Sequence, residues 1–339
     1  MQSLSIHAPM GIGKLLDTAF RLYRAHFGRA VLTGAILLVP VGILSSVLLG
    51  TTVNSYLQFF AAALDQPLLA DEINTAAFGQ VSQTLLATLF VVLLGYVLNA
   101  LAFLALTVQA DADSRGLHGT IGASLRSALR RFWAYTGLTL LTFLLAIAVL
   151  IGVYFGFILI ALFFGGMITG LAWFFDADEI IAVGAVLVGL VLFFIIAALA
   201  ILPIVYLSGR WIVAPVLIYV ERCGPVRALT RSWALTRGSF WRMAGLLLLL
   251  VILNSVVLAL PVNLIQFAML VLITPQMFGA VNGLFVGLGY LVNILWYPFL
   301  TWTLVLVYYD LRVRNENYDL TLRIQALERA ARPSTLPGA

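Results

Sequence analysis

Six long runs of uncharged, largely apolar residues restrict what this chain can fold into. They lie near residues 31–51, 83–108, 137–164, 180–207, 243–274 and 283–309, and none contains Asp, Glu, Lys, Arg or His. A helix that crosses a bilayer needs about 20 such residues. The whole chain is 63% hydrophobic and 10% charged, against about 25% charged in soluble domains. We therefore expect an all-α, polytopic membrane protein with six transmembrane helices, and exclude a disordered chain or a soluble domain.

The basic residues are sorted to one side of this six-span arrangement. All 19 Lys and Arg residues fall before the first run, between runs two and three, between runs four and five, or after the sixth. Cytoplasmic loops are enriched in Lys and Arg. The pattern predicts a multi-pass membrane protein whose basic side and both termini lie in the cytoplasm. The opposite side carries acids and no cation: Asp65, Asp71, Glu72, Asp176, Asp178 and Glu179.

The basic segments before runs one, three and five resemble one another. Phe27, Phe132 and Phe240 enter these runs at nearly equal spacing, each preceded by similar apolar positions. This predicts three repeats, near residues 10–110, 115–220 and 222–314, each an interfacial amphipathic helix followed by a two-span hairpin. The membrane domain would cover 1–315, and 316–339 would form a short cytoplasmic tail. A chance likeness among arginine-bearing loops is the alternative.

Each of these basic segments has one apolar face and one cationic face. Helices with this pattern lie in the membrane interface, and arginines near anionic lipid contribute about 1 kcal/mol each. The alternative is that the arginines only anchor the chain and set its topology. The candidate lipid-headgroup contacts are Arg21, Arg24, Arg126, Arg130, Arg227 and Arg231.

Polar and small residues inside the runs predict helix packing. Asn99, Asn254 and Asn293 are candidates for interhelical hydrogen bonds. Glycines at four-residue spacing let helices approach closely, as in Gly279, Gly283 and Gly287 and in Gly152 and Gly156. Acids followed within a few residues by arginine where a run ends predict local ion pairs: Asp111 or Asp113 with Arg115, Glu221 with Arg222, and Asp310 with Arg312 or Arg314.

No constellation of residues points to catalysis. The histidines, His7, His26 and His118, have no metal-ligand spacing, and Cys223 is the single cysteine. No phosphate-binding loop or nucleophile motif is present. We expect no enzyme activity, no cofactor and no metal site.

Three stretches resemble a known family. Residues 13–28, 210–241 and 308–320 are similar to bacterial membrane proteins grouped with the membrane domain of glycerophosphoryl diester phosphodiesterase. In such enzymes hydrolysis belongs to a separate soluble barrel with paired histidines and metal-binding carboxylates. No such barrel lies in this sequence, so the resemblance implies a module of the bacterial cytoplasmic (inner) membrane whose biochemical role is unknown and for which an enzyme label would be misleading.

Two functions follow from these observations. The first is a non-enzymatic membrane protein that engages anionic lipid or organises a membrane complex, with a protein partner at its cytoplasmic face and no nucleic acid. The second is a permease-like transporter subunit working with a separate ATPase. The latter rests on Ala228 and Gly238, which resemble the coupling helix of import permeases. The oligomeric state stays open.

Overall fold

The computed structural model describes residues 10–65, 71–117, 119–174, 179–274 and 277–316, and this part of the chain is helical without any strand. This confirms the all-α prediction. The predicted tail beyond residue 316 lies outside the described residues. In chain order the helices are α1 (Ile12–Ala25), α2 (Phe27–Asp65), α3 (Asp71–Ser114), α4 (Ile121–Phe174), α5 (Glu179–Arg210), α6 (Ala214–Val220), α7 (Pro225–Leu235), α8 (Phe240–Leu253), the π-helical turn η1 (Asn254–Ala259), α9 (Leu260–Leu272) and α10 (Phe278–Glu316).

Six helical stretches are long and apolar enough to cross a membrane, which confirms the predicted number of spans. They lie in α2, α3, α4, α5 with α6, α8 with α9, and α10. The protein is a multi-pass membrane protein by the length and composition of these helices.

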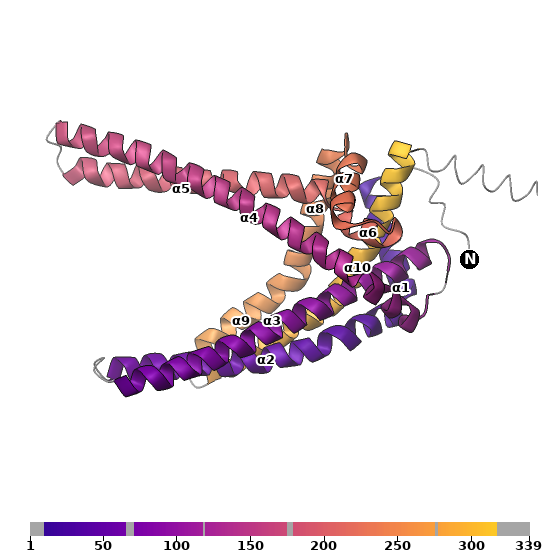
Figure 1. The fold of residues 1–339 in the computed structure, drawn as a ribbon, viewed down its shortest axis with the longest axis horizontal. Coiled ribbons are helices and arrows are strands. Elements are labelled where there is room, and N and C mark those ends of the chain that lie inside the picture. Colours follow the sequence, from indigo (N-terminus) through magenta and orange to yellow (C-terminus); the bar gives the residue numbers. More distant parts are fainter. Residues whose placement is uncertain (1–9, 66–70, 118, 175–178, 275–276, 317–339) are drawn as a thin grey trace, which may run out of the picture.

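The helices form two diverging arms that meet at one end (Figure 1). One arm packs α2, α3 and α10 together, with α9 beside them, and the other is the hairpin of α4 and α5. The short helices α1, α6 and α7 gather where the arms meet. We call this junction, with the last turns of α3 and α10 and the first turns of α4 and α8, the arginine-rich end.

Glycines let α2 and α10 pack in close contact. A Cβ atom on Gly283 would collide with the backbone carbonyl of Ser46, and one on Gly279 would collide with Gly50 and Asn54. The predicted close approach at Gly279 and Gly283 is therefore confirmed, and it is intramolecular. The glycines of α4, Gly152 and Gly156, have no such neighbour within 4 Å among the described residues.

The middle segment differs from the predicted repeat. The basic helix before span three does not end before the span, because α4 runs unbroken from Ile121 to Phe174. Residues 123–136 contain neither Gly nor Pro, so nothing interrupts the helix. In the other two segments the chain does break, at His26 and at Gly238, whose φ is 84°. A separate interfacial helix in the middle repeat is thus a wrong prediction.

The apolar faces of α1 and α7 pack against protein. Leu15 and Ala19 of α1 are buried beside α10, and Ala228 and Leu235 of α7 are buried in the same core. The prediction that these faces rest in the membrane interface is therefore wrong for most of their residues. A hydrophobic stripe shows that a helix buries one side, but not whether lipid or protein covers it.

Candidate functional site: arginines at the end where the arms meet

Five of the six predicted headgroup contacts lie on the surface of the arginine-rich end. Arg24, Arg126, Arg130 and Arg227 are exposed. None of the four has an acidic partner within the described part of the chain. Arg21, also exposed, lies 3.4 Å from Asp17, and both side chains are about two-thirds accessible. An exposed pair of this kind contributes little stability, so Arg21 can still face an anionic lipid.

Arg231 has a different role from the other five arginines. Its guanidinium donates to Glu221 at 3.1 Å and pairs with Glu316 at the end of α10. Burial alone would lower the pKa of Arg231, but the two carboxylates outweigh it and raise that pKa. Arg231 therefore joins α7 to α10 as a charged structural residue, and its prediction as a headgroup contact is wrong.

A buried ion pair lies beneath the surface where α2 begins. Arg29 pairs with Asp113, whose side chain is completely buried, and donates to the carbonyl of Gly119 at 2.9 Å. His26 Nδ1 lies 3.4 Å from the other Asp113 oxygen, Oδ2. These contacts fix the first turn of α2 to the end of α3.

A second buried pair fixes the first turn of α8 to the end of α10. Arg242 donates to Asp310 at 2.5 Å, and Arg314 donates to the same oxygen, Oδ2, at 3.0 Å. The other oxygen of Asp310 accepts the backbone N–H of Met10 at 2.7 Å. The Met10 carbonyl in turn accepts from Arg242 and Arg314 at 2.6 and 2.8 Å. One buried carboxylate thus holds three segments together.

The two buried pairs occupy matching places. Arg29 and Arg242 each stand two residues after the aligned Phe27 and Phe240, and each pairs with an acid at the exit of the hairpin that follows. Ala134 occupies that place in the middle segment. The sequence analysis missed both pairs, although the shared offset from the aligned phenylalanines was a signal. This likeness supports a relation between the first and third segments only.

Two of the three predicted local ion pairs are present. Arg115 donates to Asp111 at 2.9 Å, and Arg314 to Asp310. Glu221 pairs with Arg231 instead of Arg222, which is therefore a wrong prediction. Arg222 adopts a left-handed backbone conformation, with φ 51°, as the chain turns from α6 toward α7.

Tyrosines of α10 complete the acid–arginine contacts. Tyr309 donates to Asp111 at 2.5 Å and accepts from Arg115 at 3.0 Å. Tyr308 donates to Glu221 at 3.1 Å. The carboxylates at the exits of α3 and α6 are thus joined to α10 by hydrogen bonds.

The loop that resembles a permease coupling helix is built differently from that expectation. Ala228 is fully buried in α7, and Gly238 lies in the turn after the helix. Arg210 is enclosed by the rings of Tyr206, Trp233 and Phe240, at 5.1–5.6 Å from their centroids. These contacts hold the end of α5 against α7 and the first residue of α8.

Two exposed tryptophans lie near the starts of α4 and α8, close to the arginine-rich end. Trp133 of α4 and Trp241 of α8 are 80% and 85% exposed, and each stacks edge-on against the preceding phenylalanine. Tryptophan collects at membrane–water interfaces. Arg130 lies about one helical turn before Trp133 on the same helix, α4.

One of the three predicted interhelical asparagines is confirmed. Asn99 of α3 accepts from Tyr297 of α10 at 3.1 Å. Asn254 and Asn293 make no side-chain hydrogen bond to the described residues. Two glutamines also make contacts between helices: Gln109 of α3 donates to Thr33 of α2 at 2.8 Å, and Gln266 of α9 donates to Asn282 of α10 at 3.1 Å.

The described residues contain no group of three His, Cys, Asp or Glu side chains that could hold a metal ion. His7 and His118 lie outside those residues. Cys223 is buried, and its thiol donates to the carbonyl of Leu217 at 3.4 Å. Comparison of the chain with models of protein families, with curated proteins and with solved structures finds no match.

Proposed function

We propose that this chain is a non-enzymatic integral protein of the bacterial inner membrane whose arginine-rich end binds anionic lipid headgroups on the cytoplasmic side. The observation that carries the proposal is the division among the arginines. Arg29, Arg231 and Arg242 are paired with buried or partly buried acids, whereas Arg24, Arg126, Arg130 and Arg227 face outward without one among the described residues.

The unpaired arginines are suited to phosphate-bearing lipids. Guanidinium groups bind phosphate through two parallel hydrogen bonds, and each charge near an anionic leaflet contributes about 1 kcal/mol. The exposed tryptophans support this proposal, because tryptophan collects at membrane–water interfaces. The ion pairs of Arg231 hold α7 to Glu221 and α10, and the apolar face of α1 packs in the same core as α10, so Arg227 and Arg24 are presented on fixed helices.

The non-enzymatic part of the proposal rests on how the acids are used. Asp111, Asp113, Glu221 and Asp310 are all engaged by arginines or tyrosines at the arginine-rich end. A carboxylate held in this way is a structural group rather than a free base. The resemblance to the membrane domain of glycerophosphoryl diester phosphodiesterase, and a role in organising a membrane complex, remain predictions. The permease reading has lost its main support, since Ala228 is buried and Gly238 lies outside the helix.

The test replaces the four unpaired arginines by glutamine. Arg24→Gln, Arg126→Gln, Arg130→Gln and Arg227→Gln together remove four charges near the surface, worth several kcal/mol of attraction to anionic lipid. The measurement is the anionic phospholipid that stays with the protein through detergent purification, at low and high salt.

The matched control replaces the same four arginines by lysine, which keeps the charge but loses the planar guanidinium. We expect the glutamine variant to lose bound anionic lipid and the lysine variant to keep most of it, with the difference shrinking at high salt. Equal retention by all three proteins at low salt would refute headgroup binding and leave these arginines with topology alone.

A further inference from the structure

A second feature lies away from the arginine-rich end, in the membrane-spanning part of α2 and α10. Between these helices is a groove of about 280 Å³. Ligand pockets for drug-sized molecules usually measure about 300–1,000 Å³. The groove is near the lower end of this range, which suits a narrow ligand. The lining residues are Val39, Gly42, Ile43, Ser46, Val47, Leu284, Gly287, Leu288, Tyr290, Leu291 and Ile294.

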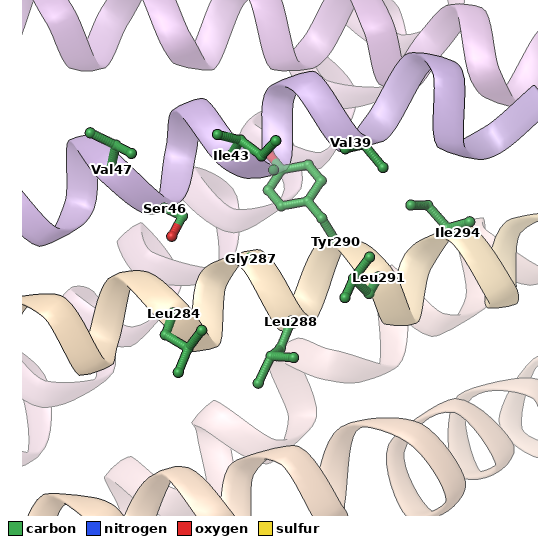
Figure 2. Close-up of a pocket in the computed structure, with 11 residues that line it drawn as sticks. Val39, Ile43, Ser46, Val47, Leu284, Gly287, Leu288, Tyr290, Leu291 and Ile294 are labelled. Atoms are coloured by element: carbon green, nitrogen blue, oxygen red, sulfur yellow. The ribbon is translucent and has the colours of Figure 1, made fainter.

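Small residues make the groove, and large apolar ones form its rim. Ser46 and Gly287 leave the space open, while the side chain of Tyr290 packs against Gly42, reaches from α10 toward α2 and closes one side (Figure 2). Ile43 and Leu291 at the rim are 62% and 52% exposed. The groove therefore opens sideways, in the plane where a bilayer presents acyl chains.

The hydroxyl of Ser46 is the feature that points to a ligand. Thr33 and Thr51 of the same helix donate to the backbone carbonyl four residues earlier, which is the usual solution for a hydroxyl in a spanning helix. Ser46 makes no hydrogen bond to the described residues, and Figure 2 shows its oxygen directed toward α10. An unpaired hydroxyl in hydrocarbon is costly, so a ligand that accepts a hydrogen bond would be favoured there.

The depth of Ser46 identifies the kind of acceptor. At 1.5 Å per residue, Ser46 lies about 25 Å along α2 from Arg29, and the hydrocarbon core is about 30 Å thick. Ser46 is thus close to the far boundary of the core, where the ester carbonyls of the opposite leaflet lie. From Ser46 the groove runs back along α2 toward Val39 and Ile294, that is, toward the middle of the bilayer.

We propose that this groove binds one acyl chain of a glycerophospholipid from the leaflet opposite the arginine-rich end, with the Ser46 hydroxyl donating a hydrogen bond to the ester carbonyl of that chain. The chain then lies against Gly287 with its methyl end near Ile294. This site uses neither the arginines nor the headgroup, so it stands apart from the proposed function and either can fail without the other.

The experiment embeds the full chain in bilayer discs of phosphatidylcholine, whose neutral headgroup keeps the arginines out of the test. A small fraction of the lipid carries a photoreactive diazirine in the acyl chain, attached through an ester in one preparation and through an ether in the other. Crosslinked residues are identified by mass spectrometry of peptides. The reference surface is the exposed side of α4 around Leu150 and Tyr154, which faces the same lipid without a groove.

With the ester lipid we expect more crosslinks at Ile43 and Leu291 than at the reference surface of α4. Ser46→Ala should lower groove labelling about fivefold, the factor for one net hydrogen bond, and should leave labelling by the ether lipid unchanged. Thr51→Ala is the matched control, because the Thr51 hydroxyl donates to a backbone carbonyl of its own helix and Thr51 does not line the groove.

A second variant tests the groove itself. Gly287→Leu fills the space, since a Cβ there sits at an ordinary 3.6 Å from Ser46, whereas Gly152→Leu adds the same bulk where nothing lies within 4 Å. We expect the first to abolish groove labelling and the second to leave it intact. The proposal would be overturned if the groove residues were labelled no more strongly than α4. It would also be overturned if Ser46→Ala reduced groove labelling equally with the ester lipid and the ether lipid.

Discussion

Asp310 joins parts of the chain that are far apart in the sequence. Its carboxylate is fully buried and holds Arg242, Arg314 and the backbone of Met10. Removing one partner of a buried ion pair typically costs about 3–5 kcal/mol, because the remaining charge loses its counter-ion. The pair of Asp17 and Arg21 is built from the same residue types, but it is exposed.

We therefore predict that Asp310→Asn lowers the free energy of unfolding by about 3 kcal/mol or more. The thermal midpoint of the detergent-solubilised protein should fall accordingly. Asp17→Asn, the matched exposed control, should cost less than about 1 kcal/mol. Unfolding followed by circular dichroism measures both. Similar midpoints for the two variants would show that the buried pair does not stabilise the junction of the arms.

Cys223 gives a second prediction at this scale. Burial raises the pKa of its thiol, and the thiolate is the reactive form. Near neutral pH we expect Cys223 to react with a maleimide much more slowly than a cysteine placed at the exposed Arg227 position in a Cys223→Ser background. The rate for Cys223 should rise only at a more alkaline pH than the rate for the exposed thiol. Equal rates at neutral pH would contradict the burial.

The sequence could indicate the charged residues but not all of their partners. Pairs four residues apart, such as Asp111 with Arg115, follow from helix geometry alone. Arg29 with Asp113 and Arg242 with Asp310 depend on how helices from different parts of the chain meet. Arg227 and Arg231 were both predicted as headgroup contacts. Arg227 is exposed and Arg231 is paired, because only Arg231 faces the acids Glu221 and Glu316.

At the scale of elements, the contact of α2 with α10 determines one arm of the molecule. Gly283 faces the backbone of Ser46, while Gly289, on the same helix, has no neighbour within 4 Å among the described residues. Overpacking a close contact typically costs about 1–3 kcal/mol. An open helical glycine, by contrast, gains up to about 1 kcal/mol when replaced by alanine.

The prediction is that Gly283→Ala lowers the thermal midpoint and Gly289→Ala leaves it unchanged or raises it slightly. Both variants add one methyl group to α10, so the comparison isolates the contact with α2. A Gly289→Ala protein that is the less stable of the two would mean that the helices do not pack through Gly283.

Helix boundaries were predictable where the chain carries a breaker and not where it depends on context. Gly238 ends the segment before α8, as its backbone conformation requires. Residues 123–136 carry strong amphipathic character but no breaker, so the basic segment and the span form one helix, α4. The periodicity of α1 predicted its buried face correctly, while the partner of that face, α10, could not be read from the pattern.

At the scale of the whole molecule, hydropathy predicted the six spans. The distribution of charge predicted that the basic residues of the described chain would lie at one end. Neither pattern could predict that the α4–α5 hairpin diverges from the other arm (Figure 1). The apolar residues of a lipid-facing helix and of a helix inside a bundle are the same types, because lipid is as apolar as a protein core.

Substituted-cysteine labelling from each side of the membrane tests the central claim, that the arginine-rich end is cytoplasmic and the opposite ends of the arms are outside. In a Cys223→Ser background, single cysteines replace the exposed residues Arg126 and Arg227 at the arginine-rich end. Single cysteines also replace Asp71 and Met277 at the other end. An impermeant maleimide added to intact cells should label Asp71→Cys and Met277→Cys, and should reach Arg126→Cys and Arg227→Cys only after the membrane is opened. Labelling of Arg126→Cys or Arg227→Cys in intact cells, with none at Asp71→Cys, would show that the arginine-rich end is outside the cell and would contradict the predicted topology.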